Sequence, residues 1–221
     1  MNYGIILFSG SSVRFNSQTQ KQFIEINNKP LFLYSVDVFS SNKNIDALVL
    51  VTNVDKMDYV KSLLPRGNKP IYVINGGLTR KESSFNGLKK LKELGVDDNS
   101  KVLIHDAARV LITSKMIDEC LEALNNNKSV TIARDVTSTI TTIEGNYIDR
   151  NSLKEIETPQ GFNFIDIYNA HINSNESTTD DTTLMKNAGI KTKLIIDNSL
   201  NIKVTTIEDL EIVKAILERR D

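Results

Sequence analysis

A glycine- and serine-rich loop with two basic residues follows the first apolar segment of this chain. Residues 3–8 form a short, continuous apolar run, which is typical of a buried strand in a parallel sheet. From Ser9 to Ser12 the side chains are small enough for backbone N–H groups to approach an anion closely. Arg14 and Lys21 add the positive charge that a polyphosphate needs. The loop therefore predicts a phosphate site, although an ordinary strand-to-helix turn has the same pattern.

A second loop combines glycine, arginine and a hydroxyl at the predicted end of another strand. A glycine pair ending at Gly77 precedes Arg80 and Ser83, so the backbone is open to a ligand that a cation and a hydroxyl can contact. Thr79 is the predicted N-cap of a long helix, and Glu82 completes a capping box. A capped helix whose glycines serve only the turn explains the same residues, and both interpretations stay open at this point.

An acid and an arginine follow a third predicted strand. The carboxylate of Asp106 is suited to a metal ion or a ribose hydroxyl, and the guanidinium of Arg109 is suited to a phosphate. We expect His105 to be hydrogen-bonded structure rather than a ligand, and His171 to lie on the surface or at an interface. Lys203 stands between two apolar residues near a helix start, where it can point at a phosphate or simply project from a strand.

Composition narrows the class of protein. The 221 residues fit one domain, 1–221, and the 27 Lys and Arg balance 28 Asp and Glu, so no basic field attracts nucleic acid. No apolar stretch approaches the roughly 20 residues that span a bilayer, and the N-terminus has no basic leader. We therefore expect a cytoplasmic protein without membrane contact. Cys120 is the single cysteine and is predicted to pack in the core.

Strands and helices alternate along the chain. After residues 3–8, further strands are expected at residues 45–51, 70–74, 101–104, 130–133, 194–197 and 201–204, and helices at residues 30–39, 55–64, 80–94, 116–124, 164–173 and 207–217. This alternation predicts an α/β fold with a mostly parallel sheet covered by helices on both faces. Such sheets bind ligands at the carboxyl ends of their strands, where the three loops described above lie.

One segment departs from the alternation. Two β-branched runs, residues 137–143 and 147–150, flank turn residues and predict a threonine-rich hairpin. Its edges need cover, which favours a partner subunit over an exposed flap. Farther on, Asp180 and Asp181 either cap the next helix or form the acidic pair of a metal-dependent glycosyltransferase; we favour the cap.

Seven motifs in order resemble the 2-C-methyl-D-erythritol 4-phosphate cytidylyltransferase family, whose close relatives are the ribitol-5-phosphate cytidylyltransferases. They are Ser9-Gly10-x-x-x-Arg14 with Lys21-Gln22, Gly76-Gly77-x-x-Arg80-x-x-Ser83, His105-Asp106-Ala107-Ala108-Arg109, Asp149-Arg150-Asn151, Thr158-Pro159-Gln160, Thr179-Asp180-Asp181 and Asn201-Ile202-Lys203-Val204-Thr205. The resemblance implies a Rossmann-like nucleotidyltransferase three-layer sandwich with a twisted sheet and a protruding β-arm at about residues 134–158. It also implies a homodimer held by the two arms.

The resemblance further implies the site residues. Those expected to bind the nucleotide are Phe8, Ser9, Gly10, Ser11, Ser12, Gly77, Arg80, Ser83 and Asp106. The expected catalytic cations are Arg14, Lys21 and Lys203. The expected acceptor-binding residues are Arg109, Thr139 and Arg150, and the sequence leaves open which subunit supplies the last two. Mg²⁺ is the implied cofactor, held mainly by the phosphates of CTP and by Asp106.

The expected reaction transfers CMP from CTP to 2-C-methyl-D-erythritol 4-phosphate and releases pyrophosphate. Ribitol 5-phosphate is the alternative acceptor, and a non-catalytic nucleotide-binding relative is a second alternative. The family pattern usually has glycine at Ser12, proline at Gln20 and at Val110, and often an acid at Leu78. The arm also departs from the pattern at residues 138–141. These departures affect the nucleotide loop and the acceptor side, so the sequence leaves the identity of the polyol phosphate open.

Overall fold

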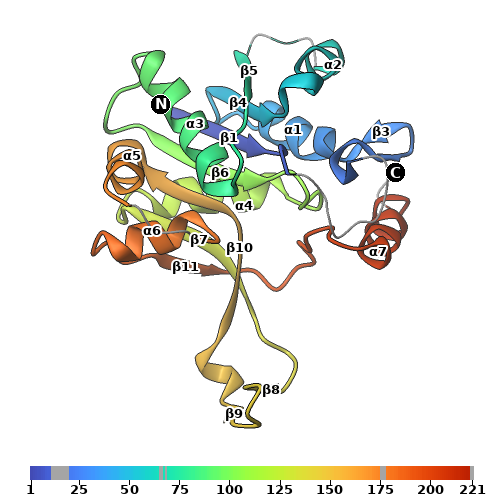
Figure 1. Cartoon of the computed structure of the whole chain (residues 1–221), viewed down its shortest axis with the longest axis vertical. Helices are drawn as coiled ribbons and strands as arrows, with labels where there is room; N and C mark the ends of the chain where they lie inside the picture. The colour runs from blue at the N-terminus through green and yellow to red at the C-terminus, as the bar shows by residue number, and fades with distance from the viewer. Residues whose placement is uncertain (11–19, 65–66, 68, 175–177, 220–221) are drawn as a thin grey trace.

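In the part of the chain that the structure describes, a seven-stranded sheet runs through the centre with helices on both sides (Figure 1). The computed structural model describes residues 1–10, 20–64, 67, 69–174 and 178–219. The strands are β1 (Asn2–Leu7), β2 (Glu25–Ile26), β3 (Lys29–Pro30), β4 (Ala47–Thr52), β5 (Ile71–Asn75), β6 (Lys101–Asp106), β7 (Ser129–Asp135), β8 (Ile140–Thr141), β9 (Tyr147–Ile148), β10 (Lys154–Asn163) and β11 (Lys193–Ile196). The α-helices are α1 (Leu31–Ser41), α2 (Met57–Leu63), α3 (Arg80–Glu93), α4 (Ser114–Ala123), α5 (Phe164–Ile172), α6 (Asp181–Asn187) and α7 (Ile207–Leu217). The 3-10 helices are η2 (Lys21–Phe23), η3 (Val54–Lys56) and η4 (Arg150–Ser152).

The large sheet is mostly parallel, as the alternation of elements predicts. Its strand order is β11-β7-β10-β6-β1-β4-β5. β1 pairs in parallel with β4 and β6, β4 with β5, and β11 with β7. β10 runs antiparallel to its neighbours β6 and β7. The carboxyl ends of β6, β1, β4 and β5 consequently lie together at one edge of the sheet.

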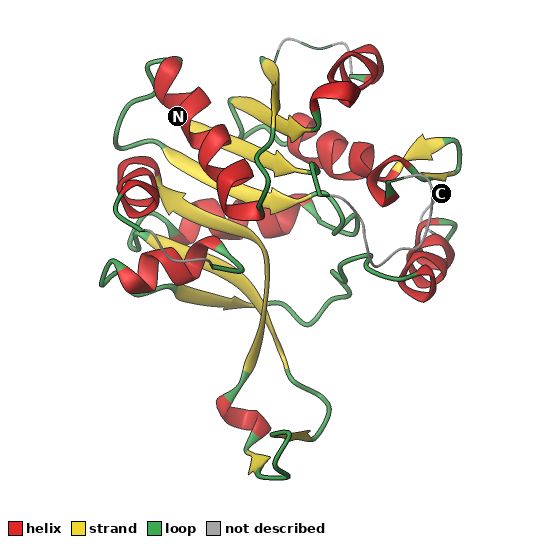
Figure 2. Ribbon diagram, viewed as in Figure 1, coloured by secondary structure: helices red, strands yellow, loops and turns green. Residues whose placement is uncertain are grey.

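Helices cover both faces of the sheet (Figure 2). Alternate residues of the central strands pack against these two helix layers. Ile6 and Leu50 belong to the core that also contains buried residues of α1, α2 and α4. Ile5 and Val49 belong to the opposite core, with residues of α3, α5 and α6. Every residue of β4 is buried, as expected for a strand covered on both faces, and all of them except Thr52 are apolar. The predicted three-layer sandwich is confirmed, and Cys120 is buried in the first core as expected.

Strand β10 is the main element that the sequence did not reveal. The sequence predicts an arm that ends near residue 158 and a helix from residue 164, whereas Thr158 lies in the middle of a ten-residue strand. Pro159 is tolerated there because the pairing with β7 shifts register between Ile156 and Gln160, which interrupts the hydrogen-bond ladder. The strand leads from the arm to the interior of the sheet and carries Thr158 beside β6.

The prediction of a closing strand at residues 201–204 is wrong. The N–H of Val204 donates to the carbonyl of Ala108 at 2.9 Å, and side chains bind the neighbouring carbonyls. Arg109 donates to the carbonyl of Asn201 at 2.7 Å, and Lys21 donates to that of Val204 at 2.7 Å. Because side chains satisfy these backbone groups, the segment is extended without forming a strand.

The last helix holds this segment in place. Thr206 and Asp209 form a capping box at the start of α7. Val213 and Leu217 of α7 then pack in a third core with Val204 and Leu31. The helix thus anchors the loop that carries Lys203. None of the helices in the described ranges is long and apolar enough to cross a bilayer.

The predicted arm is present and projects away from the body of the molecule (Figure 1). It leaves the sheet at the end of β7, turns through the short antiparallel pair β8–β9 and returns along β10. The hairpin prediction is therefore confirmed, although its paired part is only two residues long on each side. Ile143 and Tyr147, near the tip, are largely exposed in the single chain.

Candidate active site

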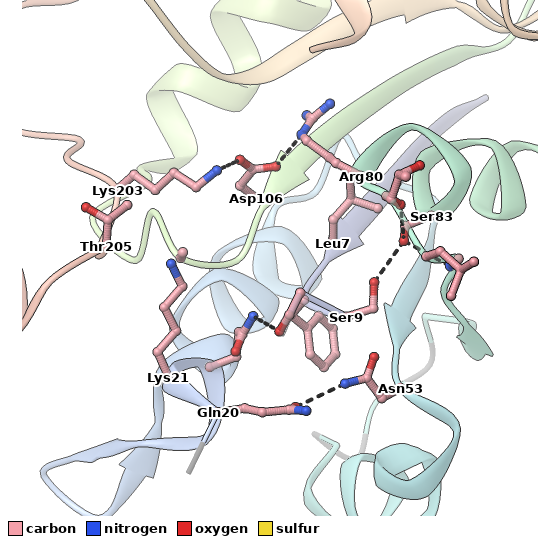
Figure 3. Close-up of a pocket in the computed structure, with 17 residues that line it drawn as sticks. Leu7, Ser9, Gln20, Lys21, Asn53, Arg80, Ser83, Asp106, Lys203 and Thr205 are labelled. Atoms are coloured by element: carbon pink, nitrogen blue, oxygen red, sulfur yellow. Dashed lines mark hydrogen bonds and ion pairs between the residues drawn. The ribbon is translucent and has the colours of Figure 1, made fainter. Parts of the chain in front are cut away.

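A cavity of about 570 Å³ opens at the carboxyl ends of β6, β1, β4 and β5, where the topology predicts a ligand site (Figure 3). Its polar lining comes from loops far apart in the sequence. The described residues that line it are Leu7, Phe8, Ser9, Gly10, Gln20, Lys21, Gln22, Asn53, Gly77, Leu78, Thr79, Arg80, Ser83, Asp106, Ala108, Lys203 and Thr205. Ser11, Ser12 and Arg14 lie outside the described residues.

Asp106, the last residue of β6, receives a cation on each carboxylate oxygen (Figure 3). Arg80 Nε donates to Oδ1 at 3.0 Å, and Lys203 Nζ donates to Oδ2 at 2.5 Å. Burial by itself raises the pKa of this carboxyl group, but Arg80 and Lys203 outweigh burial and hold the pKa well below its usual range. Asp106 is therefore an ionised carboxylate at the cavity wall over the whole physiological pH range.

Arg80 is turned toward protein carboxylates. Its Nη1 donates to Asp181 Oδ2 at 2.7 Å, while its Nε holds Asp106. Burial lowers the pKa of the guanidinium, but the two carboxylates more than compensate and raise the pKa above its usual value. The sequence singled out Arg80 as a nucleotide-binding residue. The structure places it on the cavity wall, where its described ion pairs are to Asp106 and Asp181.

Ser83 is the centre of a hydrogen-bond network that shapes the glycine turn. Its hydroxyl lies 2.9 Å from the carbonyl of Thr79, which can only accept, so Ser83 donates there. It accepts from the N–H of Gly77 at 3.0 Å, and the 2.9 Å contact with Ser9 then has Ser9 as the donor. A Cβ at Gly77 would collide with Glu82, so glycine is required for this close approach. The network joins the first two predicted loops in one wall.

The predicted capping box at α3 is half confirmed. Thr79 accepts from the N–H of Glu82 at 3.1 Å, as an N-cap should. The carboxylate of Glu82 instead accepts from the N–H of Leu78 at 2.7 Å, one residue before the cap. The start of α3 is thereby fixed beside the cavity, where its N–H groups and dipole favour an anion.

Two lysines approach the cavity from the other side. Lys21, in η2, and Lys203, in the loop between β11 and α7, both line the cavity. The same loop supplies the carbonyl of Val204 to Lys21. Gln22, next to Lys21, donates to the carbonyl of Gly10 at 3.1 Å. These contacts connect the first loop to the C-terminal loop, so both ammonium groups face the same space (Figure 3).

His105 is a structural residue, as predicted. The Thr158 hydroxyl accepts from the N–H of Asp106 at 3.1 Å, so its own proton is directed to His105 Nδ1 at 3.0 Å. His105 Nε2 lies 3.2 Å from the carbonyl of Arg109 and therefore carries the ring proton. Burial lowers the pKa of the imidazole to about 3. A neutral ring with both nitrogens engaged fixes the loop from Asp106 to Arg109 and is not available as a base.

The three residues expected to bind the acceptor do not meet within one chain. Arg109 is not among the described residues that line the cavity; it donates to the carbonyl of Asn201 and lies 3.5 Å from Glu157. Thr139 and Arg150 belong to the exposed arm, where Arg150 donates to the carbonyl of Thr137 at 2.7 Å. The acceptor-binding role of these three residues stays a prediction.

Sequence reasoning missed the supports behind the cavity. Asp180 caps α6 as predicted, accepting from the N–H of Thr183 at 2.9 Å. Asp181, however, is buried and ion-paired with Arg80, and it also accepts from His171 Nε2 at 3.0 Å. The expectation that His171 lies at the surface or an interface is wrong, because its ring is buried beside this carboxylate. The Thr-Asp-Asp motif was the only sequence signal that could have pointed to Asp181.

The fold and the cavity together define an α/β nucleotidyltransferase. The structure is similar to that of 4-diphosphocytidyl-2C-methyl-D-erythritol synthase from Anaerococcus prevotii, with a TM-score of 0.84 and 28% identity over 98% of this chain and 96% of that chain. A sequence profile described as IspD: 2-C-methyl-D-erythritol 4-phosphate cytidylyltransferase matches residues 3–219.

Curated relatives carry two acceptor names. A 2-C-methyl-D-erythritol 4-phosphate cytidylyltransferase from Clostridium botulinum is 37% identical over 99% of this chain and 98% of the relative. A ribitol-5-phosphate cytidylyltransferase from Vibrio parahaemolyticus is 35% identical over 100% of this chain and 98% of the relative. The chain belongs to the 2-C-methyl-D-erythritol 4-phosphate cytidylyltransferase family and is a CTP-dependent nucleotidyltransferase. This membership removes the glycosyltransferase interpretation of Asp180 and Asp181.

Proposed function

We propose that this enzyme transfers CMP from CTP to 2-C-methyl-D-erythritol 4-phosphate, giving CDP-methylerythritol and pyrophosphate for isoprenoid synthesis. The observation that carries the proposal is the array of Arg80, Asp106 and Lys203 along a nucleotide-sized cavity, in a chain of this family. Relatives named for methylerythritol phosphate and for ribitol phosphate have similar identities, 37% and 35%. Transfer to ribitol 5-phosphate is therefore the second candidate.

The cavity suggests how CTP binds. We place the base against the wall formed by Ser9, Gly77 and Ser83, whose hydrogen bonds to one another fix the shape of that wall. The triphosphate then extends toward the two lysines, Lys21 and Lys203, whose charges oppose those of the phosphates. Arg14 lies outside the described residues. In the sequence it belongs to the glycine- and serine-rich loop that begins at Ser9, and we propose that it adds a third cation.

The chemistry requires charge stabilisation more than proton transfer. A phosphate oxygen of the acceptor attacks the α-phosphorus of CTP, the bond between the α-phosphorus and its bridging oxygen to the β-phosphate breaks, and pyrophosphate leaves. The nucleophile is already ionised at neutral pH, so no general base is needed. This agrees with the neutral, fully engaged state of His105. Lys21 and Lys203 are proposed to stabilise the negative charge that collects in the transition state.

The donor set at the cavity fits Mg²⁺ bound mainly through the substrate. Among the described residues no group of three or more acidic, histidine or cysteine side chains forms a metal cage. Mg²⁺ usually binds through one or two carboxylates together with substrate phosphates, and Asp106 supplies one ionised carboxylate. Each of its oxygens has a second lone pair beside the one that accepts from Arg80 or Lys203. The ion would neutralise phosphate charge and orient the triphosphate.

We also propose a homodimer whose arms complete the sites. The arm, which carries Thr139 and Arg150, projects away from the body that contains β6 (Figure 1), and this supports the proposal, as do the exposed apolar side chains near the arm tip. Mixing two impaired variants, Arg150→Ala and Lys203→Met, at an acceptor concentration far below KM, where each alone has low activity, tests it. If the arm acts on the partner's site, random dimers recover about one quarter of wild-type activity. No recovery after subunit exchange, or sedimentation as a monomer, contradicts the shared site.

Pyrophosphate release tests the reaction itself. CTP and Mg²⁺ are incubated with 2-C-methyl-D-erythritol 4-phosphate and, separately, with ribitol 5-phosphate, beside a Lys21→Ala control. Faster turnover with 2-C-methyl-D-erythritol 4-phosphate, lost in the Lys21→Ala control, supports the proposal. Faster turnover with ribitol 5-phosphate would make that compound the acceptor instead. CTP binding without turnover on either acceptor favours the non-catalytic alternative.

A further inference from the structure

Behind the cavity, a buried carboxylate joins four elements. Asp181 opens α6 and is 1% exposed. Its Oδ1 accepts from Ser84 of α3 at 2.7 Å and from His171 of α5 at 3.0 Å, and its N–H donates to Gln160 of β10 at 3.1 Å. Its Oδ2 accepts from Arg80 at 2.7 Å. Asp181 is absent from the described cavity lining, so any effect on a ligand must pass through another residue.

Arg80 connects this buried group to the cavity. Its guanidinium uses Nη1 for Asp181 and Nε for Asp106, so one planar group is clamped between an inner and an outer carboxylate. An arginine held only by Asp106 would be free to swing toward the phosphates and abandon that carboxylate. With Asp181 in place, Arg80 is held on Oδ1 of Asp106, and Lys203 donates to Oδ2 of the same carboxylate. The orientation of Asp106 thus depends on a residue outside the cavity.

The surroundings of Asp181 fix its own geometry. Hydrogen bonds from Ser84 and His171 converge on Oδ1, which leaves Oδ2 for Arg80. The His171 ring stacks on Phe85 with ring centroids 5.3 Å apart and an angle of 3° between the planes. A carboxylate restrained this closely can hold a guanidinium in a single orientation, as outer-shell partners of functional groups commonly do.

We propose that Asp181 is a positioning residue for nucleotidyl transfer, which fixes Arg80 and through it the Asp106 carboxylate at the CTP site. The proposal rests on the proposed function for the role of Asp106. A buried ion pair that only stabilises the fold is the competing explanation. The two explanations predict different results for the combined variant. If Asp181 acts through Arg80, substituting both residues costs no more activity than substituting Arg80 alone. If the two residues act separately, their fold-losses in activity multiply.

The test is a double-mutant cycle with Asp181→Asn, Arg80→Met and the combined variant. Asp180→Asn is the matched control, because Asp180 is the adjacent acid and caps α6 without contacting Arg80. We measure kcat and KM for CTP, the dissociation constant of CTP with Mg²⁺, and the melting temperature of each variant. Ser84→Ala, which removes one hydrogen bond to Asp181, provides a milder perturbation if Asp181→Asn folds poorly.

The expected result is a loss of kcat/KM of about 10- to 100-fold for Asp181→Asn, in the range typical of outer-shell partners. The combined variant should be no worse than Arg80→Met alone, and Asp180→Asn should remain within about twofold of wild type in activity. Multiplying effects in the cycle overturn the proposal, as does a folded Asp181→Asn or Ser84→Ala enzyme with wild-type kinetics and binding. If wild type turns over neither acceptor, the proposed function fails, and the cycle in CTP affinity still decides the role of Asp181.

Discussion

Replacing Ser83 by alanine tests how the glycine turn contributes to CTP binding. The hydroxyl is buried and makes hydrogen bonds to Thr79, Gly77 and Ser9 at 2.9, 3.0 and 2.9 Å. Gly77 and Ser9 line the cavity, so in the Ser83→Ala variant water replaces part of the hydrogen bonding that these two residues lose. The net cost is therefore nearer that of one or two hydrogen bonds than of three, about 1–2 kcal/mol.

These bonds exist without a ligand, so their loss loosens the turn before CTP arrives. If the binding-competent turn becomes a minor conformation, the apparent affinity falls by the same fraction. A cost of about 1–2 kcal/mol then raises KM for CTP by about 5- to 30-fold, since about 1.4 kcal/mol corresponds to a factor of ten. We expect kcat to change little, because the reacting groups Lys21 and Lys203 are untouched.

The assay follows pyrophosphate release over a range of CTP concentrations at saturating acceptor. Ser62→Ala is the control, because Ser62 is an exposed serine whose hydroxyl donates within its own helix to Tyr59. Melting temperatures of both variants separate local loosening from global unfolding. A KM within about twofold of wild type, or a fall in kcat at unchanged KM, would refute this explanation of the turn.

Three further predictions concern the charged residues. Lys203→Met should lower kcat by about 100- to 1,000-fold, because it removes a proposed transition-state cation. Steady-state measurement of kcat checks this prediction, and a loss below about tenfold contradicts it. Burial raises the pKa of Asp181, but Arg80 and His171 outweigh burial and lower it to about 2. This carboxylate therefore stabilises the fold above the unfolded pKa near 4, by about 2 kcal/mol, and the contribution disappears as the pH falls from about 4 to 2. Denaturant unfolding of wild type and Asp181→Asn should show that acid-dependent difference, and parallel pH curves would refute it. Arg150→Ala should raise KM for the acceptor at least about tenfold and leave KM for CTP unchanged, as acceptor-dependent kinetics will reveal; an equal change in both contradicts its assignment.

The sequence predicted the layers of the fold because burial on both faces leaves an obvious pattern. The apolar strand predicted at residues 45–51, observed as Ala47–Thr52, and the alternating helices require a covered parallel sheet, and the structure has one. β10 was hidden because Pro159 argues against a central strand, and only the register shift with β7 makes it tolerable there. Residues 201–204 misled in the opposite way. Their sequence is typical of a strand, but side chains bind the carbonyls of Asn201 and Val204, and the segment pairs with no strand in the described part of the chain.

For the site, the sequence identified the residues of the cavity wall more readily than their partners. Ser83, Asp106 and Lys203 stand in short motifs beside strand or helix ends, so their convergence followed from topology. That Arg80 turns from the cavity interior toward Asp181 could not be foreseen, because the contact spans 101 residues and depends on how α3 and α6 pack. The same is true of His171, whose burial follows from packing on Phe85.

The most direct test of the account is a competition between the two acceptors. The enzyme is given CTP and Mg²⁺ with equal concentrations of 2-C-methyl-D-erythritol 4-phosphate and ribitol 5-phosphate, and the CDP-linked products are quantified by mass spectrometry. Their ratio equals the ratio of kcat/KM values and is independent of enzyme concentration. We predict that CDP-methylerythritol predominates by at least about tenfold. A predominance of CDP-ribitol, or the absence of both products while CTP binds, would contradict the proposed function.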